Sequence, residues 1–453
     1  MSGPLRLLPG EGDSLPALPR QRKEPRARPS WAADPIDELA DRLMEPVSAA
    51  VHPYEVAALL ESDGLTGDQI TTRYARSGLF TLAEDLYARV PRHYPEPPPT
   101  ADPWRPDHLR CALRGLVFAL PGLAYVLGPG LLDGPHAVRG LVAAGLTAWA
   151  WNQALSHRAY LRLGTTGPAA AGRTLRLGAP AGALLATVAG LLLAGPGTAG
   201  AFAAGQSCYL GAATVLLVLG RERALLAALS PVTAGAAALP WWQPPGAVAA
   251  ALLLATAGLA ALAAAHAVRA ALRSGPAPAG ATPPLTRSLP YGLFGLAAGV
   301  LAMLTGAVDP YAVVVLTLSM GFAEWLLYRY RGLAVAALRA STQPRDFTLR
   351  AARALALCLS AYVVLLAAGA VFAGAGAAPL LGLGAVLWTA LLLQAFGVAW
   401  PPAAVCLTAA AGEAAATAAG LPTGPVQLVC RCAAALVLLF LACRILGRPT
   451  AHR

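Results

Sequence analysis

Two ionisable side chains lie within apolar sequence near the end of the chain. Glu413 stands a few residues before the turn 421–424, and Arg431 stands a few residues after it. At about 1.5 Å of helix rise per residue, both lie roughly 10 Å deep if the flanking segments cross a bilayer. A charge at that depth is costly unless it is paired or faces water. We therefore expect the two to face each other or a shared cavity, either as a clamping salt bridge or as part of a transport pathway.

Five further polar residues occupy apolar segments and are candidates for a substrate pathway. Glu324 lies beside Trp325 near the end of one segment, and Asn152 and Gln153 lie at a similar depth in an earlier one. Gln206 and Gln394 are isolated amides. The competing interpretation is that Glu324 extends to the membrane surface and that the glutamines join neighbouring helices by hydrogen bonds.

Three more candidates lie in the first and seventh apolar segments, which are equivalent in the two halves. Arg114 and Pro121 belong to the first segment, and Pro290 begins the seventh. Proline kinks a helix and frees backbone carbonyl groups, which suits a helix that lines a pathway, although membrane helices tolerate proline without such a role.

The composition places these residues in a membrane protein. The chain has 453 residues, of which 57% are hydrophobic and 13% charged, and its mean hydropathy is +0.56. A soluble domain has about a quarter of its residues charged. The net charge of +11 suits loops that face anionic lipid. We expect an all-α polytopic membrane protein whose partner is the lipid bilayer, with no nucleic acid.

The residue types of metal and catalytic centres form no recognisable pattern. Seven cysteines lie in apolar segments without a CxxC motif or a Cys/His cluster. We expect no metal, no cofactor, no disulfide framework and no enzymatic activity.

Apolar runs of about 20 residues predict twelve membrane spans. They cover roughly 109–131, 137–156, 176–195, 200–220, 224–240, 246–268, 289–307, 310–329, 351–373, 379–397, 401–420 and 425–446. The fifth and eleventh are the least hydrophobic. The outer turns GPGLLDG, GPGTAG, WWQPPG, VDP, AGAGAA and LPTG contain no Lys or Arg. The positive-inside rule then places both termini, including the tail 447–453, in the cytoplasm of a multi-pass cell-membrane protein.

An internal repeat divides these spans into two halves, 109–268 and 289–446. Trp151 and Trp325 begin two similar stretches, and at the same offset Thr174-Leu175-Arg176 matches the later TLR at 348–350. The cytoplasmic segment 269–288 links the halves. Two six-helix halves with the same orientation are a design found in transporters.

The region before the spans has three parts. Residues 1–33 form a basic, Pro-rich tail without a signal peptide. Residues 34–94 form a small acidic helical module in the cytoplasm, with helix starts at Asp34 and His52 and a capping box from Thr66 to Gln69. A Pro-rich linker, 95–108, follows. The module is a candidate site for a cytoplasmic protein partner.

The spans and their loops resemble the polysaccharide-flippase branch of the multidrug/oligosaccharidyl-lipid/polysaccharide (MOP) exporter superfamily. The resemblance rests on the 6+6 arrangement, the loop WNQALSHRAYLRLG and its counterpart YRYRGLAVAALRASTQPRDFTLR. It implies a V-shaped cleft lined by the first and seventh helices, and export of lipid-linked sugars, drugs or peptidoglycan precursors by alternating access. It also implies basic residues in the cavity, for which Arg114, Arg431 and Arg139 are the candidates.

The sequence favours a flippase-like exporter of a lipid-linked saccharide or amphipathic substrate. One alternative is a non-transporting membrane scaffold in cell-envelope assembly. Another is a major-facilitator-type exporter, although the loop pattern of that family is absent. A cleft lined by Glu413, Arg431 or Asn152 would favour transport, whereas charges sealed in a lateral salt bridge would favour the scaffold.

Overall fold

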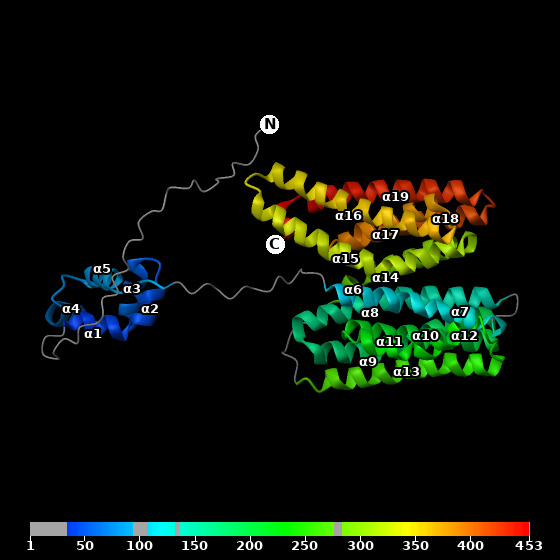
Figure 1. The fold of residues 1–453 in the computed structure, drawn as a ribbon, viewed down its shortest axis with the longest axis horizontal. Helices are drawn as coiled ribbons and strands as arrows, with labels where there is room; N and C mark the ends of the chain where they lie inside the picture. Colours follow the sequence, from blue (N-terminus) through cyan, green and yellow to red (C-terminus); the bar gives the residue numbers. More distant parts are fainter. Residues whose placement is uncertain (1–33, 94–106, 132–135, 276–282, 453) are drawn as a thin grey trace, which may run out of the picture. The chain divides into compact units, whose positions relative to one another are not determined.

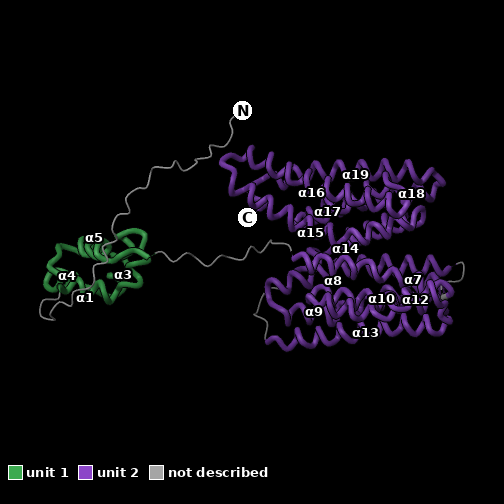
Figure 2. The backbone as a smooth tube through the Cα atoms, viewed as in Figure 1, with its two compact units in different colours: residues 1–101 green, residues 102–453 purple. Residues whose placement is uncertain are grey.

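The computed structural model describes residues 34–93, 107–131, 136–275 and 283–452. Within these ranges all regular structure is helical. The chain divides into two compact units, 1–101 and 102–453 (Figure 2). The predicted basic tail 1–33 and most of the predicted linker lie outside the described residues.

The first unit is a bundle of five short helices. They are α1 (Pro35–Arg42), α2 (Met44–Ala49), α3 (Pro53–Ser62), α4 (Gly67–Tyr74) and α5 (Leu79–Arg89). The predicted helix starts are confirmed, because the Asp34 side chain accepts from the Ile36 N–H and Thr66 and Gln69 form the capping box. The sequence did not predict α2, which is only six residues long.

An apolar centre holds these five helices together. Val56, Leu60, Leu82 and Leu86 come from α3 and α5 and are fully buried. A bundle of this size is near the lower limit for stability by core burial alone. Loss of one such leucine side chain, at about 2–5 kcal/mol, would remove much of that stability.

A charge pair joins the two ends of the bundle and gives it a pH dependence. Arg89 Nη1 lies 2.8 Å from Asp34 Oδ2 and 2.7 Å from Asp37 Oδ1. The hydrogen bond from Arg89, together with the bond from the Ile36 N–H, lowers the pKa of Asp34. Because the folded pKa is depressed, the stabilisation is present at neutral pH. It is lost below about pH 4, as the pH falls through the folded value.

We expect Arg89→Met to destabilise the bundle at pH 7 by less than ~1 kcal/mol, because the paired side chains are about a third exposed. The difference should shrink as the pH falls through the lowered pKa of Asp34, because a protonated carboxyl group loses its ion pair with Arg89. Hydrogen exchange of peptides from α1 and α5 in the full chain measures it. An Arg89→Met effect of equal size at pH 7 and below that pKa would contradict this assignment.

The second unit contains the long apolar helices. They are α6 (His108–Ala119), η2 (Leu120–Gly122), α7 (Leu123–Leu127), η3 (Pro129–Leu131), α8 (Ala137–Thr166), α9 (Pro168–Ala194), α10 (Thr198–Val218), α11 (Glu222–Ala228), α12 (Ser230–Ala238), α13 (Gly246–Leu272), η4 (Leu285–Arg287), α14 (Leu289–Val308), α15 (Pro310–Ala340), α16 (Pro344–Ala373), α17 (Ala377–Ala395), α18 (Trp400–Ala418), α19 (Thr423–Leu446) and η5 (Pro449–His452).

Nine helical segments of the described chain are long and apolar enough to cross a membrane. They are His108–Leu127, α9, α10, α13, Leu285–Val308, α15, α16, α17 and α19. The protein is therefore a multi-pass helical membrane protein. The other three predicted spans are also helical but fall short of that criterion. Asn152 and Gln153 reduce the hydropathy of α8, Glu413 reduces that of α18, and a break before Pro231 separates α11 from α12.

The helices form two groups, α6–α13 and α14–α19 (Figure 1). In the first group α9 packs against α8 and α10, α13 packs against α10, and α6 and α7 pack against α11 and α12. In the second group α16 packs against α15 and α17, α19 packs against α17, and α14 packs against α18. The extensive contacts between the groups are α6 with α15 and α8 with α14.

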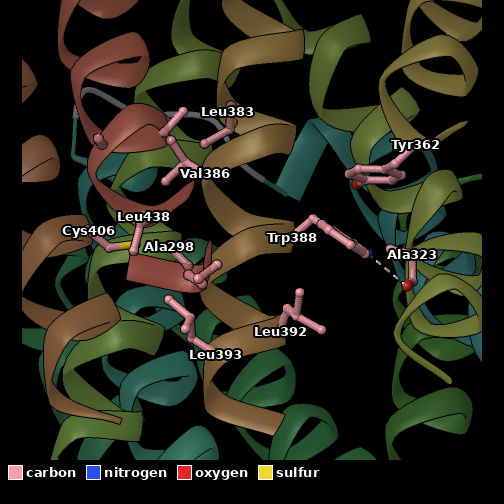
Figure 3. Close-up of a cluster of buried hydrophobic side chains, with 14 of the residues drawn as sticks. Ala298, Ala323, Tyr362, Leu383, Val386, Trp388, Leu392, Leu393, Cys406 and Leu438 are labelled. Atoms are coloured by element: carbon pink, nitrogen blue, oxygen red, sulfur yellow. Dashed lines mark hydrogen bonds between the residues drawn. The ribbon is translucent and has the colours of Figure 1, made fainter. Parts of the chain in front are cut away.

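Trp388 lies at the centre of the second group. Its side chain is 1% exposed, and its ring lies 6.4 Å from that of Tyr362. The indole Nε1 donates to the Ala323 carbonyl oxygen at 3.2 Å, which joins α17 to α15 (Figure 3). Trp388 belongs to the buried apolar cluster of this group and points towards Ala323 and Tyr362, so the buried indole N–H has its partner inside an apolar core.

The two predicted prolines have different effects. Pro121 lies in η2 and interrupts the helix between α6 and α7, as the predicted kink requires. Pro290 lies in the first turn of α14, where the missing N–H is not needed by the helix. Pro290 therefore starts a helix and does not kink it.

Candidate functional site: a charged seam between the helix groups

Two helix contacts join the groups α6–α13 and α14–α19. We use "the seam" for these two contacts, α6 with α15 and α8 with α14. The seam is of interest because it collects histidine, aromatic and charged side chains in a unit that is otherwise mostly apolar.

Glycines allow α6 and α15 to touch. A methyl group on Gly321 would lie 2.5 Å from the Cys111 carbonyl oxygen and 3.0 Å from the Gly115 Cα. No side chain fits there without movement of a backbone. Close approach through small residues is a common way for membrane helices to pack, because it maximises van der Waals contact.

We expect Gly321→Ala to push α6 and α15 apart and to lower stability by about 1–3 kcal/mol, as overpacking does. Thermal unfolding of the purified full-length protein measures the loss. Gly205→Ala in α10 is the matched control, because a methyl group there meets nothing within 4 Å. Equal effects of the two substitutions would contradict the close seam contact.

Arg114 crosses the seam through its guanidinium group. Its Nη1 pairs with Glu324 Oε1 of α15, and its Nε lies 3.1 Å from Glu222 Oε1 of α11. Arg110 also binds Glu222 Oε1, at 2.9 Å. The Glu222 side chain is 7% exposed, Arg114 14% and Glu324 19%. Two arginines and two glutamates thus share one network, of which Arg110 is 43% exposed and the other three are largely buried. Arg114–Glu324 is the pair between the groups.

Ring contacts lie beside this network. Trp325 Nε1 donates to His108 Nδ1 at 3.0 Å, so this hydrogen bond also joins α15 to α6. Phe322 stacks on Trp325 with ring centres 5.5 Å apart. Together with Gly115 and Gly321, these rings line a groove of about 370 Å³ along α6 and α15.

The contact of α8 with α14 has the same character. The rings of His157 and Tyr291 stack with centres 3.6 Å apart, and His157 Nδ1 lies 3.1 Å from Ser288 Oγ. Gly292 faces the Ala150 carbonyl oxygen, which lies 3.1 Å from the position of a Cβ on Gly292. Each of the two seam contacts therefore combines a glycine with a histidine–aromatic pair.

Gln153 is the predicted polar residue that lies at this second contact. Its Cγ is 2.7 Å from the position of a Cβ on Gly295 of α14. Asn152, beside it in the chain, is partly buried and makes no side-chain hydrogen bond to any residue that the structure describes. The structure thus places Gln153 and Glu324 at the two seam contacts.

Glu413 and Arg431 lie away from the seam, inside the second group. Arg431 Nε lies 2.9 Å from Glu413 Oε1, and Nη2 lies 2.8 Å from Oε2. The predicted pairing is confirmed. Arg431 also donates to the Pro379 carbonyl oxygen and to Thr305 Oγ1, both at 2.9 Å.

This second network seals the two charges. Arg431 is 0% exposed and Glu413 is 1% exposed. The network ties α14, α17, α18 and α19 together at one level. Of the two alternatives that the sequence left open for this pair, the geometry fits the clamping salt bridge and does not fit a cavity lining.

The remaining predicted amides join helices or lack a partner. Gln206 Oε1 accepts from the Tyr125 hydroxyl at 3.0 Å, which links α10 to α7. Gln394 Nε2 is buried and has no hydrogen-bond partner among the described residues. Gln206 therefore joins two helices, as the competing interpretation of the sequence expects, whereas no hydrogen bond from Gln394 to another helix is present among the described residues.

Sequence reasoning missed Glu222, His108 and His157. Glu222 lies between Arg221 and Arg223, in the short loop between the predicted spans 200–220 and 224–240. The sequence did hold one indication of its importance. Glu222 is the one carboxylate in this loop and begins a helix, where an acidic side chain stabilises the free backbone N–H groups. Its pairing with Arg114 could not be inferred, because the two are far apart in the chain.

The comparisons with known proteins found no matching family model, no matching curated protein and no matching solved structure.

Proposed function

We propose that this protein is a secondary transporter in which twelve spans form two six-helix halves that rock about the seam. The observation that carries the proposal is the symmetry of the seam. In chain order, α6 with α7 corresponds to α14, and α8 corresponds to α15. Exchanging the halves turns the contact α6–α15 into α14–α8, which is the other seam contact. A two-fold axis along the membrane normal produces this relation.

The contacts within the halves support the same duplication. The pairs α8–α9, α9–α10 and α10–α13 correspond to α15–α16, α16–α17 and α17–α19. In the first half, α6 packs against α11 and α7 packs against α12. In the second half, the corresponding contact is that of α14 with α18. This correspondence supports the proposal that α8, α11 with α12, and α18 are spans as well, which would give twelve.

The arginines support cytoplasmic termini. The ends of α8 and α15 carry Arg158 and Arg162, and Arg329, Arg331 and Arg339. Both helices are about 30 residues long, or roughly 45 Å, and extend well past a hydrocarbon core of about 30 Å. The positive-inside rule places these extensions in the cytoplasm.

The seam network provides two discrete states for the halves. The Arg114–Glu324 pair and the His108–Trp325 hydrogen bond form only while α6 and α15 are together. When the halves separate on this side, Arg114 retains Glu222, a partner in its own half. The arginine is therefore never left without a carboxylate, which lowers the cost of the transition.

The proposed cargo is an amphipathic molecule such as a lipid-linked saccharide. Arg110 and Arg114 are already paired with carboxylates, and Arg431 is sealed. Of the three expected cavity cations, Arg139 alone is exposed. This charge balance favours a saccharide headgroup with little net charge over a strongly anionic pyrophosphate.

Single-molecule fluorescence transfer in proteoliposomes tests the rocking motion. Dyes at Arg223 on α11 and Arg329 on α15 would report the distance between the halves, since both positions are exposed. We expect two distances, whose populations change when a fluorescent polyprenyl-phosphate saccharide is added and crosses the bilayer. One unchanging distance, with no translocation of the probe, would contradict a transporter.

A non-transporting scaffold is the second candidate, and the sealed Glu413–Arg431 pair favours it. The first unit also exposes Val51, Tyr54 and Phe80, and the latter two rings lie 5.6 Å apart. A cytoplasmic protein that binds residues 34–94 would use such a surface. On this proposal Tyr54→Ser abolishes function without changing the distance between the halves.

A further inference from the structure

The described C-terminal residues turn back against the helix ends of the second group. α19 ends at Leu446, and Gly447 leads towards η5 (Pro449–His452). Thr348 Oγ1, near the start of α16, donates to the Gly447 carbonyl oxygen at 2.9 Å. η5 packs against α15, α16 and α19. We use "the C-terminal turn" for residues 447–452.

His452 attaches this turn to two further helices through ring contacts. Phe347 lies in the first turn of α16, and Phe396 is the residue that follows α17. Their ring centres lie 5.3 Å and 5.0 Å from that of His452, and both contacts are edge-to-face. Phe347 is 1% exposed, so this contact excludes water. One imidazole therefore connects the end of the chain to α16 and α17, in addition to its covalent link to α19.

The hydrogen bonds of His452 suit the neutral imidazole. Nε2 lies 2.8 Å from the Leu446 carbonyl oxygen, and a carbonyl oxygen only accepts, so Nε2 carries the proton. Nδ1 is buried and has no hydrogen-bond partner among the described residues. In the charged imidazolium Nδ1 becomes a donor as well. A buried donor with a charge and no acceptor costs more than a buried neutral acceptor.

The charged group that acts on this imidazole is a cation. The guanidinium carbon of Arg331 in α15 lies 5.3 Å from the centre of the Phe396 ring, which His452 also contacts. Burial lowers the pKa of His452, the hydrogen bond to Leu446 opposes this, and Arg331 lowers it further. The other titratable side chains at these helix ends are Arg329 and Tyr330 of α15, Arg345, Asp346 and Arg350 of α16, and Cys443, Arg444 and Arg448 near the end of α19. The acid among them, Asp346, pairs with Arg350.

We propose that the C-terminal turn is a pH-sensitive latch, which is closed while the imidazole of His452 is neutral and opens when it is protonated. In the closed state the latch ties the ends of α16 and α17 to α19. Protonation puts a second cation beside Phe396 and a donor without an acceptor at Nδ1. The charged side chain then moves into water, and the turn leaves the helix ends. The latch does not depend on whether the protein transports a cargo.

The lowered pKa of His452 sets the direction of the pH dependence. The closed state binds fewer protons than the open state, so closure is most stable above about pH 6.5, the ordinary value for histidine. Below that value the ratio of closed to open protein falls by up to roughly tenfold for each pH unit, until the pH reaches the pKa of the closed state. Acid on the side of the membrane that the turn faces therefore opens the latch.

Hydrogen exchange of the full-length protein in nanodiscs at pH 7.5 and pH 5.5 tests the latch. The informative peptides contain the start of α16 and the C-terminal turn. The comparison is with His452→Phe at the same pH, which removes the intrinsic effect of pH on exchange. Phenylalanine keeps an apolar ring in the same place and takes no proton. We expect similar protection in the two proteins at pH 7.5, and exchange up to roughly tenfold faster in the parent at pH 5.5.

Two further variants complete the test. His452→Lys carries a charge at both pH values and should lack protection in these peptides at both. His266→Phe removes an exposed histidine from α13 of the first group and should respond to acid as the parent does. An equal response of the parent and His452→Phe to acid would overturn the proposal, because another group would then be titrating. His452→Lys as well protected as the parent at pH 7.5 would overturn it too.

Discussion

Arg431→Met is expected to destabilise the second helix group by about 3–5 kcal/mol, the usual cost of removing one partner from a buried ion pair. Glu413 would remain 1% exposed with no cation beside it. The carbonyl group of Pro379 would also lose the donor that Arg431 supplies at 2.9 Å. Thermal or denaturant unfolding of the full-length protein in nanodiscs measures the loss.

The matched control removes both charges. Glu413→Gln combined with Arg431→Met leaves no buried ion, so we expect it to recover most of the stability lost by Arg431→Met alone. Glu413→Gln alone should be milder than Arg431→Met, because the amide oxygen still accepts from Arg431. A stability of Arg431→Met within about 0.5 kcal/mol of the parent would contradict the clamp.

Exchanging the two residues is a sharper test of the geometry. Pairing alone predicts partial rescue, since the charges remain opposite. The structure predicts no rescue, because a carboxylate at position 431 would face the Pro379 carbonyl oxygen. Thr305 could not satisfy it, since its hydroxyl already donates to the Leu301 carbonyl oxygen at 2.7 Å. Two acceptors would then meet in an apolar interior.

Arg114→Gln should have the largest effect on the seam. It removes the ion pair between the halves and leaves Glu324 without its cation. We expect the halves to separate on the cytoplasmic side. A loss of about 1.4 kcal/mol across the seam shifts the populations of the two distances roughly tenfold. Fluorescence transfer between Arg223 and Arg329 measures the shift, and translocation of the lipid-linked saccharide should fall by at least a similar factor.

Arg110→Gln is the matched control, because Arg110 binds Glu222 within one half and is 43% exposed. It removes one arginine from the same network but leaves Arg114–Glu324 intact. We expect little change in the distance between the halves. If Arg110→Gln and Arg114→Gln shift the populations equally, total charge governs the seam and the pair across it has no special role.

Local sequence predicted the features that depend on neighbours in the chain. Asp34, His52 and Thr66 cap the helices that they were expected to cap, because a cap needs only a side chain and the N–H groups two or three residues later. The Glu413–Arg431 pair was predictable for a related reason. One short turn joins their two helices, and the two residues lie at similar distances from it. Their side chains therefore meet.

Features of the seam were not predictable in the same way. Glu222, Arg114 and Glu324 meet although they are distant in the chain. Only the packing of α6 against both α11 and α15 brings their side chains together. Pro121 and Pro290 belong to corresponding spans yet have different effects, because Pro290 stands in the first turn of its helix, where no N–H is needed, and Pro121 stands in the interior of its span.

By itself, the sequence determined that this is a helical membrane protein with capped helices before its spans and a charge pair in its last hairpin. Hydropathy and capping are local properties. In a hairpin of two helices, residues at the same distance from the turn lie next to each other. The tertiary structure decided that Glu413 and Arg431 are sealed, whereas Arg114 and Glu324 meet between the two helix groups. Apolar helices fit one another through the shapes of small side chains, such as Gly115 and Gly321, and hydropathy does not encode which of them will touch.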